Sequence, residues 1–362
     1  MSQSLFRHLW RRRSIQLLLV AALLFVIGSA VPPALISLMR PLAVGQSLTF
    51  TTLPNDTVSL MAPVDGSQGI PQPNRDRPEC AGGGMPEVPY SCFVVTLPSH
   101  QTTALTTSEA ADDSEVTVDA VMQVLFGETV ATEMHDIVVL DARSTYPVSD
   151  PVSQMSISVP NLASGMATDY FVREGLQYFF PFPSSRQSYP WFDMTAQEAL
   201  LLDYVRETER HGMETYEFHH RFPDLAMDRN SAHAITFSAD VNATLDEMAA
   251  ADFGIPRYAV DRRVWVEPES GTIVDSRTEI HLFFADDSAE STTRAFTPSP
   301  DYTIYHTVAE WDAATIAQQT EEATAVLSTL RALQVFAVVL KTAALIAVLA
   351  GVVLLLRERR GR

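Results

Sequence analysis

Two apolar segments, one near each end of the chain, constrain the fold more than any other feature of the sequence. Residues 14–39 contain no charged side chain, and residues 332–356 contain only one, Lys341. About 20 consecutive apolar residues are enough for a helix to cross the hydrocarbon layer of a bilayer. The sequence therefore predicts one transmembrane helix at 14–39 and a second one at 332–356.

Arginines flank both apolar segments and predict their orientation. Basic residues beside a membrane span stay on the cytoplasmic side. We therefore expect a two-pass plasma-membrane protein with both termini in the cytoplasm and the large central part outside the membrane. The predicted parts are a cytoplasmic tail (1–13), a transmembrane helix (14–39), an extracytoplasmic β-rich domain (41–307), a membrane-proximal helix (308–331), a second transmembrane helix (332–356) and a cytoplasmic tail (357–362).

Each apolar segment has a second interpretation. The tripeptide Gly28-Ser29-Ala30 resembles the cleavage site of a signal peptide, but the apolar run continues beyond it to Met39, which favours a retained helix. Lys341 is costly within a membrane span unless its amine reaches the interface or meets a polar group. Lys341 therefore has two interpretations. Its amine either snorkels to the membrane surface or contacts a partner helix in the membrane.

The charge of the central domain argues against nucleic acid as a partner, and its two cysteines predict a disulfide. Without the two apolar segments and their flanks, the chain keeps 14 basic and 43 acidic residues, a net charge of −29. Such a surface repels phosphate backbones, so nucleic acid is not an expected partner. The two cysteines, Cys80 and Cys92, are predicted to form a disulfide in an oxidising exterior, worth about 3 kcal/mol.

The central domain reads as antiparallel and β-rich with a few short helices, which makes the fold class α+β with a transmembrane helix on each side. The clearest element is a hairpin at 258–284, in which Tyr258, Val260, Val264 and Val266 alternate with polar residues before a turn at Pro268 and Gly271. Short helices are predicted after Thr195, as a capping box with Glu198, and after Asn242 or Thr244.

Aromatic residues are concentrated between positions 178 and 192, where three prolines exclude a long helix. One interpretation is core packing beneath a loop. The other is an apolar wall for a lipid chain. The candidate lipid-binding residues are Tyr178, Phe179, Phe180, Tyr189, Trp191 and Phe192.

Sequence motifs of catalysis and cofactor binding are missing. The chain contains no G-x-S-x-G, no P-loop, no H-E-x-x-H and no G-x-G-x-x-G after a strand. His219 and His220 are adjacent on a predicted strand and point to opposite faces, so one metal ion cannot easily use both. We therefore predict no catalytic residue, no metal and no cofactor, and an enzymatic role has no support.

Two stretches resemble the PorA family of actinobacterial envelope proteins. They are "YPWFDMTAQEALLLDYVRETERHGMETYEF" and "RYAVDRRVWVEPESGTIVD", and the membrane span at each end of the chain fits the same family. The resemblance implies a role in the mycolate-bearing envelope, where members are linked to the trafficking of mycolate glycolipids beside MmpL-type exporters and to lipoglycan assembly. Two hydrophobic helices do not enclose a pore, so pore formation is not expected.

The resulting hypothesis is a non-enzymatic, membrane-anchored protein that binds or relays a lipid or glycolipid of the mycolate type. An MmpL-type transporter is the candidate protein partner. The alternative is a scaffold or accessory subunit that docks onto an envelope lipid transporter or synthase through its membrane helices, with Lys341 as one contact.

Overall fold

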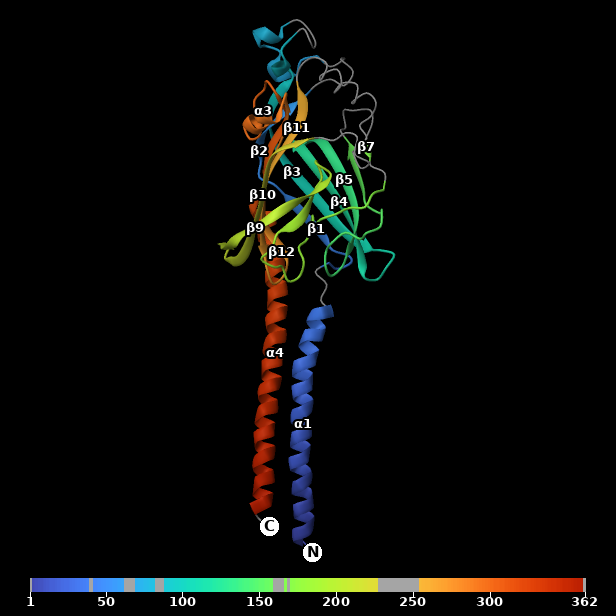
Figure 1. The fold of residues 1–362 in the computed structure, drawn as a ribbon, viewed down its shortest axis with the longest axis vertical. Coiled ribbons are helices and arrows are strands. Elements are labelled where there is room, and N and C mark those ends of the chain that lie inside the picture. The colour runs from blue at the N-terminus through green and yellow to red at the C-terminus, as the bar shows by residue number, and fades with distance from the viewer. Residues whose placement is uncertain are drawn as a thin grey trace. The chain divides into compact units, whose positions relative to one another are not determined.

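The computed structural model describes residues 2–38, 42–61, 69–81, 88–158, 166–167, 170–226 and 254–360. The chain divides into two compact units. Residues 41–323 make up a sheet domain, and residues 1–40 together with 324–362 make up a pair of helices. Figure 1 shows the strands of the first unit and the two long helices, α1 and α4, of the second.

The sheet domain is built on one antiparallel sheet, which confirms the predicted fold class. Its path is β7-β6-β5-β4-β3-β2-β13-β12-β11-β10-β9-β8, and β1 pairs with β3 beside this path. Long sequential hairpins make up each half of the sheet, and the β2–β13 pair joins the two halves. The strands are β1 (Ser47–Thr51), β2 (Asn55–Leu60), β3 (Val94–Glu109), β4 (Glu115–Phe126), β5 (Thr129–Asp141), β6 (Gln154–Ser158), β7 (Met166–Ala167), β8 (Tyr189–Asp193), β9 (Glu198–Arg210), β10 (Met213–Ala226), β11 (Ile255–Glu267), β12 (Thr272–Ala285) and β13 (Thr303–Glu310).

Helices are few in the described part of the chain. The α-helices are α1 (Ser2–Leu38), α3 (Ser288–Arg294) and α4 (Ala313–Arg360), and the 3-10 helices are η1 (Gln72–Asn74), η2 (Pro78–Cys80) and η3 (Tyr90–Cys92). The helix that leads into the second apolar segment begins at Ala313 rather than at 308, because Thr303–Glu310 pairs with β12 as strand β13. The helix predicted after Asn242 lies outside the described residues.

The predicted hairpin at 258–284 is the β11–β12 pair. Arg262 stands opposite Thr278, and Val260 stands opposite Ile280. The turn is fixed by Glu267, whose carboxylate accepts hydrogen bonds from the backbone N–H groups of Glu269 and Ser270. Gly271 has a φ of +69°, a conformation that side chains with a Cβ rarely adopt. The alternation of apolar residues and the turn residues therefore predicted this hairpin correctly.

The short helix predicted after Thr195 is wrong. Residues 198–210 form strand β9, which pairs with β8 on one side and β10 on the other. Leu200 and Leu202 are buried on one face of β9, whereas Leu201 is exposed on the other. This alternation is the pattern of a strand, and pairing with two neighbours outweighs the helix preference of the Ala-Leu-Leu-Leu run.

A disulfide stabilises the long loop that precedes β3. Cys80 and Cys92 are joined, and both are buried beside Ile70 and Phe93. Asn74 within this loop donates hydrogen bonds from its side-chain amide to the carbonyl oxygens of Cys92, at 2.9 Å, and of Val94, at 2.8 Å. The loop is thus tied covalently and by hydrogen bonds to the start of the sheet.

Candidate functional site

One side of the sheet lines a partly open cavity of about 500 Å³. Strands β3, β4, β5, β12 and β13 each contribute alternate residues, because every second side chain of a strand points to the same face. Strand β8 and the turn that follows it line the cavity from the other side. The apolar lining includes Phe50, Met122, Val124, Met134, Trp191, Ile280, Leu282 and Trp311.

A buried carboxylate, that of Asp136 on β5, lies at the cavity wall. Arg173 donates to both of its oxygens, and the Tyr178 hydroxyl donates to Oδ2 at 2.6 Å. The side chains of Arg173 and Asp136 are 0% and 2% exposed, so this ion pair is almost fully removed from water. Burial, and then the charge of Asp136, raise the pKa of Tyr178 well above its ordinary value, which keeps its hydroxyl proton in the bond.

A second buried carboxylate, that of Asp193, ends strand β8. Its Oδ1 accepts hydrogen bonds from the backbone N–H groups of Thr195 and Ala196, both at 3.0 Å. Its Oδ2 accepts from the Tyr258 hydroxyl and from Arg262 Nη2, both at 3.1 Å. The turn that was expected to open a helix is therefore closed by Asp193, and its carboxylate links β8 to β11.

The charged groups of the cavity do not form an acid–base pair. Among its described lining residues, the charged ones are Asp136, Asp193 and Arg262, and none is a histidine, cysteine or lysine. Each carboxylate already forms an ion pair with an arginine and accepts a hydrogen bond from a tyrosine hydroxyl. The arrangement is therefore a largely apolar cavity whose two carboxylates are paired with groups of the protein itself.

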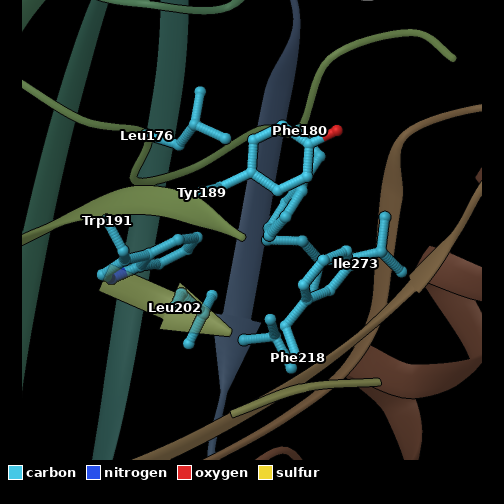
Figure 2. Packing of buried hydrophobic residues seen from close by; sticks show 9 residues of the cluster. Leu176, Phe180, Tyr189, Trp191, Leu202, Phe218 and Ile273 are labelled. Carbon is cyan, nitrogen blue, oxygen red and sulfur yellow. The ribbon is translucent and has the colours of Figure 1, made fainter. Parts of the chain in front are cut away.

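The six aromatic residues singled out in the sequence divide into two groups. Tyr178, Trp191 and Phe192 line the cavity. Phe180 and Tyr189 instead belong, together with Trp191, to a core cluster with Phe218 (Figure 2). In this cluster the ring of Phe180 lies 5.0 Å from the ring of Phe218 and 5.4 Å from that of Tyr189. Phe179 packs against the core between β3, β4 and β5.

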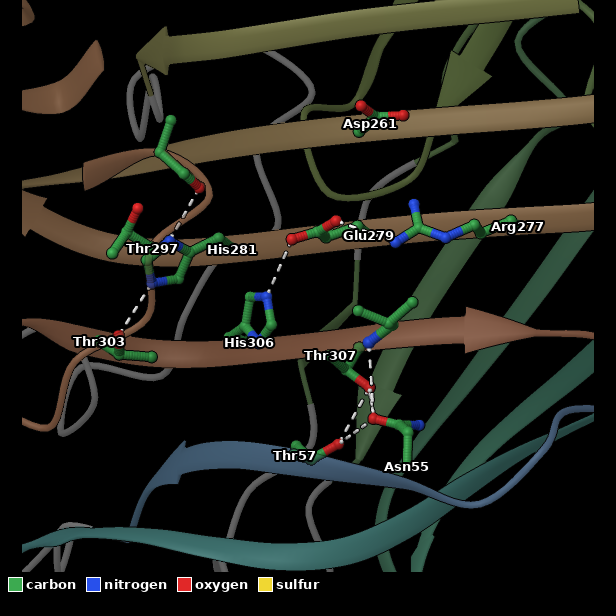
Figure 3. A network of polar contacts seen from close by, with 12 residues as sticks. Asn55, Thr57, Asp261, Arg277, Glu279, His281, Thr297, Thr303, His306 and Thr307 are labelled. Carbon is green, nitrogen blue, oxygen red and sulfur yellow. Dashed lines mark hydrogen bonds and ion pairs between the residues drawn. The ribbon is translucent and has the colours of Figure 1, made fainter. Parts of the chain in front are cut away.

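A polar network connects β12, β13 and β2 (Figure 3). The buried ring of His281 bonds through Nδ1 to the carbonyl oxygen of Ala295 and through Nε2 to Thr303 Oγ1, both at 2.9 Å. His306 Nε2 lies 3.2 Å from Glu279 Oε1. Burial lowers the pKa of His281 to about 4, so its ring is neutral at pH 7. The His281 part of the network reads as structural, because both ring nitrogens are held by groups of the protein.

The other two histidines considered from sequence are separated as expected for neighbours on a strand. His219 Nε2 lies 3.0 Å from Asp261 Oδ1, whereas His220 is buried and its ring stacks edge-on against Phe222. Burial, with a smaller contribution from Arg262, lowers the pKa of His220 to about 3. The structure brings neither of them to the cavity.

The helix unit is a second candidate site. Gly28 of α1 lies against Ala337 and Leu340 of α4, and Gly351 of α4 lies against Leu18 of α1. The two helices are therefore antiparallel and meet at glycines, where a Cβ at Gly28 would lie only 2.9 Å from the Cβ of Leu340. Figure 1 shows the two helices side by side. Lys341 is exposed at the edge of this contact.

Sequence reasoning missed the polar groups of the cavity. Asp136, Arg173 and Asp193 were not among the candidates, although each is buried. Arg262 did give a signal, because it falls in the same alternating phase as the apolar residues Tyr258, Val260 and Val264. A charge in the buried phase of a strand indicates a paired partner inside, and here that partner is Asp193.

Comparison with known proteins gives a consistent result. A sequence model of the family described as Porin PorA matches residues 13–353. A protein named Porin PorA from Corynebacterium amycolatum is 26% identical over 307 residues, which is 76% of this chain and 78% of that protein. A protein of the same name from Corynebacterium resistens is 27% identical over 378 residues, which is 85% of this chain and 90% of that protein.

These relatives correct the functional hypothesis from sequence. Porins are channel proteins of outer membranes. The predicted binding or relay of a lipid or mycolate glycolipid, the alternative scaffold role and the two-pass plasma-membrane localisation are therefore wrong for a chain with this relationship. The comparisons also lend no support to an MmpL-type partner. Pore formation was discounted because two helices were counted in one chain, which overlooks assembly of several copies.

Proposed function

This chain belongs to the PorA family, and we propose that several copies of it assemble into a water-filled channel across an outer membrane. The observation that carries the proposal is the match of both long helices and the sheet domain to a family whose corynebacterial relatives are named porins. Membership of this family also points to a channel rather than an enzyme.

The helices are the elements suited to cross the membrane. Residues 14–36 of α1 and the apolar part of α4 before Arg357 are long and apolar enough to span a bilayer. Large apolar side chains are exposed all round both helices, which is typical of a helix surrounded by lipid or by other helices. Exposed examples are Leu19, Leu23 and Phe25 on α1 and Val335, Val338, Leu345 and Ile346 on α4.

The sheet is not suited to form the channel wall. A membrane barrel presents its apolar side chains outward to lipid and its polar side chains inward. Here Met122 of β4, Leu282 of β12 and Trp191 of β8 instead face the partly open cavity. Within the described strands, no ladder joins β7 to β8, so the sheet ends at two separate edges.

A single helix pair has no lumen, because packed helices lie only about 8–10 Å apart with side chains filling the space between them. A channel therefore requires helices from several copies of the chain. The glycine contacts at Gly28 and Gly351 would make each pair a compact subunit of such an assembly.

Conductance in a planar lipid bilayer tests this proposal. The full-length chain, purified in detergent, is expected to give discrete current steps. Gly28→Leu should abolish or strongly reduce them, because the new side chain meets Leu340 and the backbone of Ala337 and separates the helices. Val339→Leu, which adds one methylene at a side chain that is 58% exposed on α4, is the matched control and should retain the steps.

The proposal would be refuted if the full-length chain were well incorporated into the bilayer but gave no current steps. It would also be refuted if Gly28→Leu conducted like the control while cross-linking showed the helix pair to be separated.

A further inference from the structure

Lys341 is the one charged residue in the apolar stretch 332–356, and it is also the only lysine of the chain. Residues 14–36 of α1 contain no acidic residue that could pair with it. The side chain is exposed, and its Cγ lies 3.5 Å from the position that a Cβ of Gly28 would take. Its apolar stem thus passes beside α1, and the apolar segments 14–36 and 332–356 offer its amine no carboxylate.

The depth of Lys341 makes contact with lipid costly. It follows Ala332 by nine residues, which corresponds to about 14 Å along a helix at 1.5 Å per residue. Its four-carbon stem is too short to cover that distance, so snorkelling brings the amine only part of the way to the membrane surface. A charged side chain at such a depth almost always faces a water-filled cavity or a partner in the interior of a bundle.

We infer that Lys341 lines the channel and, repeated once per copy, forms a ring of positive charge that selects anions. The inference rests on the proposed channel. In a closed symmetric assembly, equivalent residues of all copies lie at the same depth around the axis. Rings of lysine or arginine are the usual lining of anion pores.

Whether the channel prefers anions or cations shows which part of the molecule sets its ion selectivity, Lys341 or the acidic sheet domain. Outside the apolar segments and their flanks the chain has a net charge of −29, which would concentrate cations near any opening that the sheet domain surrounds. A ring of Lys341 side chains opposes this effect within the apolar layer. Anion selectivity would therefore come from Lys341 and not from the charge of the protein as a whole.

The ratio of chloride to potassium permeability, taken from the reversal potential in a potassium chloride gradient, measures this effect. Lys341→Gln should lower the ratio by about 25-fold for each lysine that lies within about 4 Å of the ion in water, because the lost charge attracts chloride and repels potassium by about fivefold each. Lys341→Glu should invert the preference, and Lys341→Arg should retain it. Channels whose permeability ratio is the same in Lys341→Gln as in the unmodified chain would overturn the role of Lys341 while leaving the proposed channel intact.

Access of water to position 341 gives an independent readout. Cys80 and Cys92 are joined to each other, so Lys341→Cys introduces the one free thiol of the chain. In proteoliposomes this thiol should react with a charged methanethiosulfonate reagent. Ile346→Cys is the control, because residue 346 is 63% exposed but lies about 140° further around the helix.

The outcomes separate the two proposals. A reactive thiol at 341 and an unreactive one at 346 support a water-filled lining at Lys341. Discrete channels combined with an unreactive thiol at 341 would overturn the role of Lys341 alone. Absence of channels from the unmodified chain would refute the proposed function and, with it, the lining role.

Discussion

Replacing Arg173 by methionine should destabilise the sheet domain strongly. The substitution keeps most of the apolar stem but removes the guanidinium that donates to both oxygens of Asp136. Asp136 would then remain 98% buried, and among the described residues the Tyr178 hydroxyl would be its one remaining side-chain partner. Removing one member of a buried ion pair leaves an uncompensated charge, which costs about 3–5 kcal/mol of the free energy of unfolding.

The structure offers two matched controls for this substitution. Arg77 and Glu79 form an ion pair whose side chains are 36% and 47% exposed, so Arg77→Met should cost only about 0–1 kcal/mol. The double variant Arg173→Met with Asp136→Leu removes both charges. It should recover most of the lost stability, since an apolar replacement of a buried pair is often neutral.

Urea unfolding of the full-length chain in detergent, followed by tryptophan fluorescence, measures these differences. Trp191 is 7% exposed in the core beside the cavity and should report the loss of packing. The guanidinium of Arg173 also lies 4.3 Å from the ring centre of Phe192, so part of the cost reflects this lost contact. Equal costs for Arg173→Met and Arg77→Met, or no recovery in the double variant, would refute the reasoning.

Three further predictions concern the stability of the sheet domain. Burial lowers the pKa of His281 to about 4 from 6.5, so the unfolded chain binds the proton first as the pH falls; the contribution of His281 to stability is fully present above pH 6.5 and should decrease by about 3 kcal/mol between pH 6.5 and 4. His281→Asn should make the loss of stability over this range smaller by about that amount, and the remaining loss includes that of His220, whose pKa burial lowers to about 3. Reduction of the Cys80–Cys92 disulfide, which closes a loop with a sequence separation of 12, should lower the unfolding free energy by about 3 kcal/mol in denaturant titrations with and without reductant. Gly271→Ala should lower the melting temperature, because its Cβ would lie 2.7 Å from the carbonyl oxygen of Phe180 at a φ of +69°, whereas Gly69→Ala, with open space around it, should not.

Local patterns were sufficient to predict the antiparallel hairpin at 258–284. Alternation along Tyr258–Val266 and the residues Pro268 and Gly271 define the β11–β12 hairpin, and Gly212 marks the turn between β9 and β10. The same alternation is present at Leu200, Leu201 and Leu202, where helix propensity was given more weight than burial period. Propensity is a weak guide when a segment pairs on both sides.

The cavity could not be predicted from local patterns. It depends on the pairing of β2 with β13, which joins segments about 250 residues apart and brings the two halves of the sheet together. Only then do Asp136 and Asp193 lie on the walls of one chamber, each with its own arginine. The aromatic residues of the sequence identified part of the cavity lining. Trp191 and Phe192 line the cavity, whereas Phe180 and Tyr189 pack in the core.

The functional reasoning from sequence did not consider several copies of the chain, which the proposed channel requires. Two helices in one chain cannot surround water, and this argument remains valid for the α1–α4 pair, whose glycines bring the backbones into close contact. The argument does not extend to a ring of such pairs. The surface of the helix pair is apolar except for the exposed Lys341. Such a pair is stable in a membrane only if the lysine contacts water or a polar partner. In a ring of identical pairs around a common channel, Lys341 would contact the water in the channel.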